Sequence, residues 1–179
     1  MTNPAEPPPL DVAWLVEVLE RYGVEYLLVG GVAAQAHGAR RPTTDFDCLT
    51  RRTRDNLDRL AEAMRELHAR LRAEGLDDEE AARLPVRVDG ESLARMEIST
   101  WRTDAGDLDI LADIPDRAGR HVRYDELAER AVTANLGDIA VRVAALEDVI
   151  ASKEWANRPK DREALPELRA LSDRSAGLS

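Results

Sequence analysis

A pair of glycines that precedes a pair of aspartates is the feature that most constrains how this chain can fold. Gly30 and Gly31 end the short apolar run Glu25–Val29, and an alanine-rich, helix-prone segment follows them. This order predicts a buried strand, a tight turn and a helix in succession. Asp45 and Asp47 come 14 residues after the second glycine, in a segment of alternating character that predicts another strand. The chain is therefore expected to be a mixed α/β protein.

Hydrophobic periodicity and turn residues predict the remaining elements. The expected helices cover residues 11–22, 32–37, 53–74, 125–131, 145–155 and 161–171, and the expected strands cover 25–29, 45–49, 86–88, 95–101, 108–114 and 139–143. The fold class is α/β (α+β), with a small mixed sheet flanked by helices. By domain, the prediction is a flexible lead-in at 1–10, a core at 11–144, a helical C-terminal portion packed on the core at 145–172 and a tail at 173–179.

Composition excludes several classes of protein. With 44% hydrophobic and 34% charged residues in 179 positions, the chain is expected to form one soluble domain. A net charge of −10 argues against a protein that coats nucleic acid without regard to sequence, although a local arginine cluster remains compatible with it. Cys48 is the single cysteine, so no internal disulfide is expected. With no signal peptide or membrane-spanning segment expected, the prediction is a cytoplasmic protein without membrane contact.

The two aspartates of the second strand predict a metal site. Asp45 and Asp47 are two residues apart, so both side chains leave the same face of a strand, while Phe46 points into the core. Two neighbouring carboxylates repel each other, which raises the pKa of at least one unless a cation lies between them. Mg²⁺, with Mn²⁺ as an alternative, prefers such oxygen ligands. A pair of such ions stabilises both the attacking and the leaving oxygen of an in-line displacement. A solvated strand end is the alternative for an isolated Asp-x-Asp pair.

A third carboxylate is expected from another strand. Asp109 is the preferred candidate because Leu108, Ile110 and Leu111 surround it, and an isolated acid in an apolar strand is costly to bury. Asp107 shares its strand face, so spacing does not decide between the two acids. The prediction is that Asp45, Asp47 and Asp109 hold the metal.

The glycine pair predicts an anion site. Without Cβ atoms, Gly30 and Gly31 let a phosphate approach the backbone, and the free N–H groups of a helix start favour an anion. A tight structural turn is the alternative interpretation. The acid pair that follows favours the anion site over a structural turn.

The N-terminal motifs resemble those of a known enzyme group. The segment 28–31 followed by 45–47 is similar to the motif of the polymerase-β-like nucleotidyltransferases, in which a hydrophobic residue and two glycines precede an Asp-x-Asp pair. The longer string 30–47 resembles the AbiEii/AbiGii-type toxin branch, in which Arg-x-Thr-x-Asp-x-Asp is usual. Arg41 and Thr43 occupy the first two positions of that pattern. By this resemblance, both residues are expected to bind the nucleotide.

A second motif near the C-terminus resembles the same branch. Lys153, Arg158, Lys160 and Asp161 match its Lys…Arg-x-Lys-Asp pattern, whereas Ala164 stands where relatives often carry a further Asp. Lys153 lies on an expected helix and would meet a triphosphate as a point charge, the alternative being an ordinary exposed lysine. Arg158 and Lys160 are expected to bind phosphate or an RNA backbone. Asp161 is expected at the nucleotide and also as the cap of the last helix.

The resemblance implies a polymerase-β-like nucleotidyltransferase fold and the transfer of an NMP from an NTP, with release of pyrophosphate. In the toxin branch it implies a tRNA 3′ end as the acceptor and control by a paired antitoxin protein. A protein hydroxyl or a small molecule such as an antibiotic is the alternative acceptor, and a non-catalytic binding module is the alternative to an enzyme. Phosphorylation of Thr43 would place a dianion among the expected metal ligands, which predicts loss of NTP binding.

Five arginines flank the acidic strand, and their function was open to two interpretations. They are Arg40, Arg41, Arg51, Arg52 and Arg54. They could bind phosphate or form a solvated charge cluster, and apart from the motif residue Arg41 the sequence does not decide between these.

Overall fold

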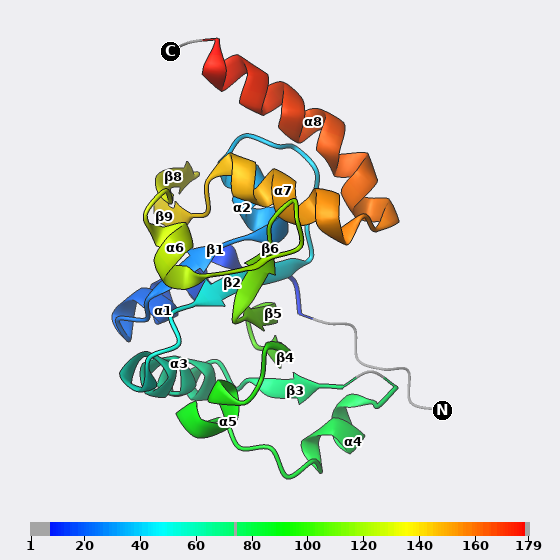
Figure 1. The fold of residues 1–179 in the computed structure, drawn as a ribbon. Coiled ribbons are helices and arrows are strands. Elements are labelled where there is room, and N and C mark those ends of the chain that lie inside the picture. The colour runs from blue at the N-terminus through cyan, green and yellow to red at the C-terminus, as the bar shows by residue number, and fades with distance from the viewer. Residues whose placement is uncertain (1–7, 74, 178–179) are drawn as a thin grey trace.

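The computed structural model describes residues 8–73 and 75–177, which form a mixed sheet with helices on both faces (Figure 1). The helices are α1 (Val12–Arg21), α2 (Gly30–Ala36), α3 (Arg54–Glu66), α4 (Asp78–Ala82), α5 (Gly90–Ala94), α6 (Tyr124–Ala128), α7 (Leu146–Ala156) and α8 (Pro159–Ala176). The strands are β1 (Tyr26–Leu28), β2 (Asp45–Thr50), β3 (Arg70–Arg72), β4 (Ile98–Thr103), β5 (Gly106–Leu111), β6 (Asp113–Pro115), β7 (His121–Arg123), β8 (Val132–Leu136) and β9 (Ile139–Val143).

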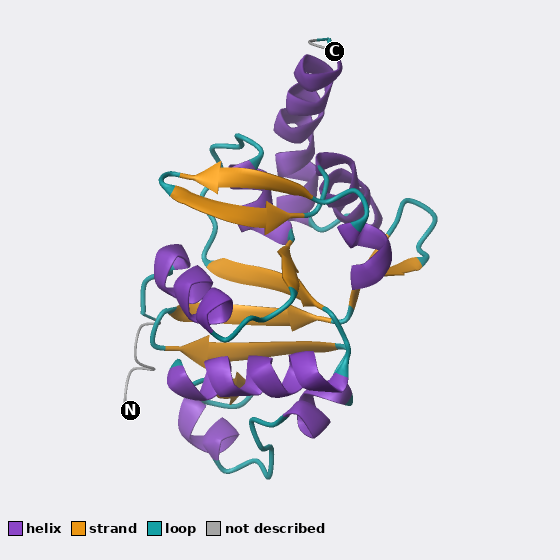
Figure 2. Ribbon diagram, turned by 90° about the vertical axis from the view of Figure 1, so that its left-hand side faces the viewer, coloured by secondary structure: helices purple, strands orange, loops and turns teal. Residues whose placement is uncertain are grey.

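The main sheet has seven strands in the order β3-β4-β5-β2-β1-β9-β8, and β6 pairs with β7 in a separate hairpin. Strand β2 runs antiparallel to β1 and parallel to β5, and β1 runs parallel to β9. Helices α1 and α3 cover one face of the sheet, while α2, α7 and α8 lie on the other (Figures 1 and 2). The predicted small mixed sheet flanked by helices is confirmed.

Strand alternation separates the core from the polar face. Phe46 and Leu108 are fully buried and Trp101 is 1% exposed, and they belong to one hydrophobic core with Leu57 and Leu60 of α3. Because successive side chains of a strand point to opposite faces, the aspartates beside Phe46 and Leu108 are directed away from this core. Packing of the apolar face therefore places the acids on the other one.

Several expected elements end elsewhere or are absent. The helix expected over 53–74 ends at Glu66, because His68 adopts a left-handed backbone with φ of 50° and the chain then enters β3. No strand forms over 86–88 in the structure. The strand expected over 108–114 is divided into β5 and β6, which belong to different sheets.

The C-terminal third also differs from expectation. Strand β8 was not expected; it pairs with β9 through the turn at Gly137 and forms the sheet edge. Helix α8 continues to Ala176, into the segment 173–179 that was expected to be a tail. Within the part of the chain that is described, no helix is long and apolar enough to cross a bilayer.

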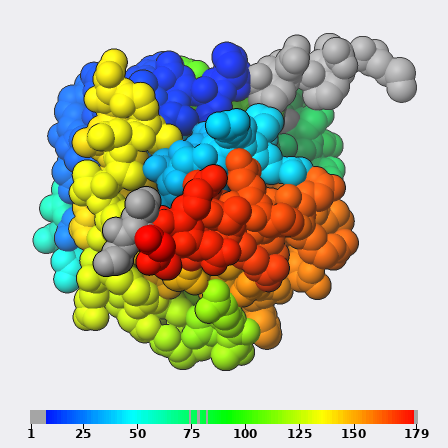
Figure 3. All heavy atoms as spheres, turned by 90° about the horizontal axis from the view of Figure 1, so that it is seen from above, coloured from blue at the N-terminus to red at the C-terminus, as the bar shows by residue number. Residues whose placement is uncertain are grey.

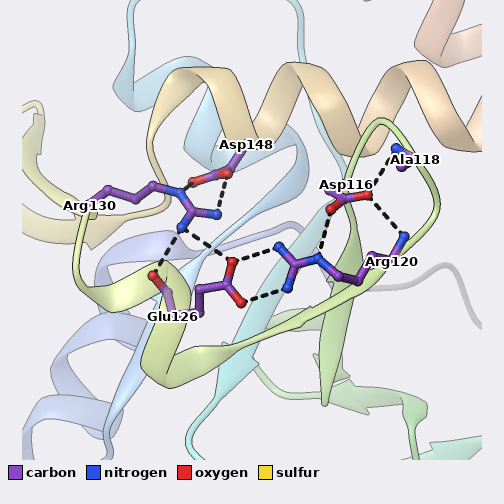
Figure 4. A network of polar contacts seen from close by, with 6 residues as sticks. All are labelled: Asp116, Ala118, Arg120, Glu126, Arg130 and Asp148. Carbon is purple, nitrogen blue, oxygen red and sulfur yellow. Dashed lines mark hydrogen bonds and ion pairs between the residues drawn. The ribbon is translucent and has the colours of Figure 1, made fainter.

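A chain of ion pairs ties the β6–β7 hairpin to α6 and α7 (Figure 4). Arg120 donates a hydrogen bond to Asp116 in the hairpin loop and two hydrogen bonds of 2.7 Å to Glu126 of α6. Arg130 likewise forms two bonds of 2.8 Å with Asp148 at the start of α7. Exposed pairs contribute little energy individually, but two-pronged arginine–carboxylate geometry fixes orientation. The network therefore orients the helix that carries Lys153.

Candidate active site

Three acids from two neighbouring strands line one pocket. Asp45 and Asp47 lie on β2, and the parallel register places Asp109 of β5 directly opposite Asp47. Opposed residues of adjacent strands share a face, about 4.8 Å apart along the sheet. The pocket has a volume of about 740 Å³ including its open mouth, and all three aspartates line it. The structure thus brings together the three acids that the sequence proposed as metal ligands.

Hydrogen bonding distinguishes Asp109 from Asp107. Asp107 is 8% exposed and receives hydrogen bonds from Arg72 Nη1 at 2.6 Å and from Arg102 Nε at 3.2 Å. Asp109 receives a hydrogen bond from Thr100, but its Oδ1 atom is buried without a hydrogen-bond partner among the described residues. Asp107 is therefore neutralised by arginines, whereas Asp109 lines the pocket and keeps one buried oxygen without a partner among the described residues.

The environment disfavours negative charge on two of the pocket acids. Burial, followed by the charges of Asp109 and Asp45, raises the pKa of Asp47 to about 6, against the opposing effect of a hydrogen bond from the Gly31 N–H. Burial is also the main cause that raises the pKa of Asp109. A cation beside these carboxylates would favour their ionised form.

The pocket acids supply carboxylate oxygens, and one of these oxygens is buried and unpartnered among the described residues. Within residues 8–73 and 75–177, no three acidic, histidine or cysteine side chains form a group that could hold a metal ion. Mg²⁺ is commonly bound through one or two carboxylates together with water and substrate phosphates, so a complete protein cage is not required for it.

The glycine pair makes room for residues of the site itself. Gly30 has a φ of +62°, and a Cβ atom there would lie 2.1 Å from Asp47 Oδ2. A Cβ atom on Gly31 would lie 2.4 Å from Thr43 Oγ1, whose hydroxyl donates to the Asp45 carbonyl at 3.3 Å. Close packing of Asp47 and Thr43 is thus sufficient to require glycine at both positions. Phosphate binding by Gly30 and Gly31 stays a prediction.

A buried carboxylate organises the cations opposite the acids. Asp161 is fully buried and accepts hydrogen bonds from Lys153 Nζ at 3.3 Å and Arg158 Nε at 2.6 Å. It also accepts from the Arg158 backbone N–H, so the N-cap of α8 is Arg158 and Asp161 completes a capping box from the third helical position. Its neighbours cover Asp161 completely, so that it does not itself line the pocket, and its expected contact with the nucleotide stays a prediction. Lys153 and Arg158 line the pocket as expected.

Lys160 presents a positive charge to the same pocket. Its charge lowers the pKa values of Asp47 and Asp109, although burial and the other acids outweigh this effect. Lys160 forms no ion pair with any residue in the described part of the chain. It is therefore the pocket cation best able to bind a new anionic group without breaking an existing pair.

The segment between α2 and β2 is fastened to α8. Arg41 lines the pocket and pairs with Glu163, and the Arg40 backbone N–H donates to Glu167 at 2.8 Å. Figure 3 shows this segment, in light blue, lying along α8, in orange to red. These glutamates could not be assigned to the site from sequence because they lie more than 120 positions from their partners.

Most of the other flanking arginines contact protein groups outside the pocket. Arg51 pairs with Glu25 and Asp125, and Arg52 donates to the carbonyls of Leu93 and Met96. Arg54 is 86% exposed and lies 3.8 Å from Asp58. Of the five flanking arginines, only Arg41 lines the pocket.

A smaller pocket of about 420 Å³ adjoins the first. It shares Gly30, Asp47, Lys153 and Arg158 with the larger pocket. Its remaining lining is mostly apolar and comprises Val29, Leu111, Ile114, Val149 and Ser152. Sequence reasoning missed this pocket because its walls come from α2, β2, β5, β6 and α7, which meet only in the folded chain.

Comparisons with known proteins agree on the kind of protein. Residues 15–166 match the family model described as the nucleotidyl transferase AbiEii toxin of type IV toxin–antitoxin systems. No curated protein matches the chain in sequence.

Three similar solved structures share the fold at low sequence identity. The lincosamide antibiotic adenylyltransferase LnuA, with lincomycin bound, has a TM-score of 0.60 at 12% identity and covers 91% of this chain and 99% of its own. ANT(2″)-Ia in complex with adenylyl-2″-tobramycin has a TM-score of 0.55 at 14% identity, with coverage of 92% and 95%. A candidate nucleotidyltransferase of Thermotoga maritima has a TM-score of 0.52 at 14% identity, with 86% of each chain covered.

Proposed function

Because this chain belongs to the AbiEii family of nucleotidyltransferase toxins, we propose that it transfers an NMP from an NTP to the 3′ end of a tRNA. The observation that carries the proposal is the pocket in which Asp45, Asp47 and Asp109 face Lys153 and Lys160. Acids on one side and cations on the other suit a metal-bound triphosphate, whose own charge is negative.

The three acids are the proposed ligands of Mg²⁺ or Mn²⁺. The bound ion would neutralise the triphosphate and stabilise charge on the attacking and leaving oxygens. The buried Oδ1 atom of Asp109 supports this assignment, since a buried polar atom without a partner is costly.

The cations of α7 and α8 are the proposed triphosphate ligands. Asp161 holds Lys153 and Arg158 in place before the substrate arrives, so little side-chain order has to be gained on binding. Lys160 and Arg41 complete the group, and Arg41 exchanges Glu163 for a phosphate oxygen. Thr43 lies beside Gly31 at the edge of the triphosphate position, with both glycines contributing backbone N–H groups.

In the reaction, an acceptor hydroxyl oxygen forms a bond to the α-phosphorus and the bond to the β-phosphate bridging oxygen breaks. Pyrophosphate leaves, and the hydroxyl proton passes to solvent. The positioned cations stabilise the charge that accumulates on the departing pyrophosphate. Transfer to tRNA would block translation, in keeping with a toxin whose partner is a cognate antitoxin protein.

The experiment is incubation of the purified protein with each α-³²P-labelled NTP, Mg²⁺ and total tRNA, and separately with cell lysate. Label on tRNA that disappears in Asp47→Ala and on addition of EDTA supports the proposal. Label on protein or on an antibiotic would transfer the assignment to the alternative acceptors, of which the solved antibiotic adenylyltransferases are examples. No label with any acceptor would favour a non-catalytic module.

A further inference from the structure

The polar face of the sheet extends beyond the pocket toward β3. The register aligns Asp45 with Asp107, Asp107 with Arg102, and Arg102 with Arg70, so these four residues form one row across β2, β5, β4 and β3. A parallel row joins Asp109 to Arg72 through Thr100. Three strand spacings separate Asp45 from Arg70, a distance of about 14 Å.

This half of the face is accessible. Arg70 is exposed, and the side chain of Arg72 is 42% exposed. Ile98, which is on the same face of β4, is 68% exposed, whereas Trp101 on the opposite face is 1% exposed. Helix α2 packs on β2 in the other half of the sheet, α7 packs on α2, and α8 packs on α7 (Figure 1).

The chemistry of the face changes along the row from acidic to basic. Arg72 and Arg102 share the Asp107 carboxylate, and Arg70 forms no ion pair with any residue in the described part of the chain. The exposed end of the row is therefore basic, on a chain whose net charge is −10. Guanidinium groups match phosphate in geometry, and an exposed row of them suits a polyanion.

We infer that the open face of β3 and β4 binds the acceptor strand, and that the acceptor is a single-stranded RNA end. Its terminal hydroxyl lies at Asp109, and the phosphates upstream of it lie against Arg72 and Arg70. Exposed Ile98 supplies an apolar contact for a base beside this track. The inference rests on the proposed function, because it takes the three acids as the point of transfer.

The test uses Arg70→Glu, since Arg70 is exposed and its replacement breaks no ion pair within the described residues. Arg54→Glu is the matched control, because Arg54 is exposed and lies on α3, on the opposite face of the sheet (Figure 2). Binding of a fluorescent RNA with a single-stranded 3′ end is measured by anisotropy without NTP. Transfer kinetics then give separate KM values for RNA and NTP.

For Arg70→Glu, the expected result is about a tenfold weaker RNA affinity and a correspondingly higher KM for RNA, since the charge is reversed beside a phosphate. The KM for NTP stays unchanged, and the dependence of log affinity on log salt falls by about one unit. Arg70→Gln, which removes charge without reversing it, gives an intermediate effect and serves if Arg70→Glu does not fold.

Equal RNA affinity for Arg70→Glu, Arg70→Gln and Arg54→Glu would overturn the inference while leaving nucleotidyl transfer intact. Transfer to a protein or small molecule that Arg70→Glu leaves unchanged would overturn it as well. Failure of the proposed function gives a different result. In that case the protein binds RNA in a way that depends on Arg70 but transfers no label.

Discussion

At the scale of single residues, side chains of the same type perform different tasks according to their neighbours. Asp107 and Asp109 are two positions apart on one strand face, yet arginines neutralise the first while the second keeps an unpartnered buried oxygen. Gly23 and Gly30 have nearly the same positive φ. A Cβ atom added at Gly23 would meet no other atom within 4 Å, whereas one added at Gly30 would collide with Asp47. Substitutions at these paired positions therefore separate effects on activity from effects on stability.

The glycine contrast predicts different effects for the same substitution. Gly23→Ala incurs only the cost of a left-handed alanine, about 1–2 kcal/mol of stability, and retains activity. Gly30→Ala incurs that cost and also displaces Asp47, so transfer is expected to fall about a hundredfold. Urea unfolding and labelled transfer measure the two effects. Equal activity of the two variants would contradict the assignment of Asp47.

The acid contrast predicts opposite effects on stability and activity. Asp109→Asn removes a buried charge beside two other acids, so stability is unchanged or higher, while transfer falls at least about a hundredfold. Asp107→Asn removes the carboxylate charge that Arg72 and Arg102 share and costs about 3 kcal/mol of stability. Its transfer rate falls much less. The reverse pattern in denaturation and kinetic assays would exchange the assignments of these two acids.

At the scale of elements, the site depends on how α7 and α8 are held together. Asp161 of α8 fixes Lys153 of α7, and Arg117 of the β6–β7 loop pairs with Glu147 and Glu154 of α7. The ion pairs of Figure 4 add a second connection from the hairpin to α7. Helix α7 is thus oriented from both sides, with its lysine in the pocket that the acids line.

The Asp161 contact predicts a pH dependence of stability. Burial would raise the pKa of Asp161, but the hydrogen bond from Arg158 and the charges of Arg158 and Lys153 outweigh it and lower the pKa. The stabilisation is therefore present above the ordinary aspartate pKa of about 3.9 and is lost as pH falls through the lower folded value. Asp161→Asn is expected to cost about 2 kcal/mol at pH 7 and to make acid unfolding less steep.

The matched control is Asp173→Asn, which changes an exposed acid of the same helix. Urea unfolding at pH 7 and pH 3 measures both variants. If Asp161→Asn and Asp173→Asn behave alike at both pH values, Asp161 does not organise the cations.

At the scale of the whole molecule, the pocket joins segments that span most of the chain. Its walls come from α2, the segment before β2, β2 itself, β5, α7 and α8. A ligand bound there contacts both the sheet and the C-terminal helices. Binding is therefore expected to stabilise the molecule as a unit.

NTP with Mg²⁺ at about one hundred times its Kd is expected to contribute about 2.7 kcal/mol, which raises Tm by about 5–10 °C. Chelation of the metal removes most of this increase. Lys160→Ala reduces it because the cation without an ion pair is lost, whereas Arg174→Ala, an exposed change on the same helix, leaves it intact. Thermal unfolding by calorimetry measures the shifts, and equal shifts for both variants would exclude Lys160 from the nucleotide site.

Much of the fold could be predicted from local pattern. The strand–glycine–helix unit, the acidic strand and the two C-terminal helices appear near their expected positions because periodicity and glycine act within a few residues. The strands that were missed, β3, β8 and those of the β6–β7 hairpin, are short and take their conformation from pairing partners. Their own residues carry no equivalent signal.

The sequence by itself determined the chemical inventory of the site: an acid pair on one strand face, two glycines before it and a basic motif near the C-terminus. Only the tertiary structure decided that Asp109 rather than Asp107 joins the pair, that Asp161 holds the cations from beneath, and that Arg70 and Arg72 continue the acidic row. The physical reason is register. Which residues of separate strands lie opposite each other is fixed by sheet pairing and by burial of the apolar face, and neither is written in the spacing of any single segment.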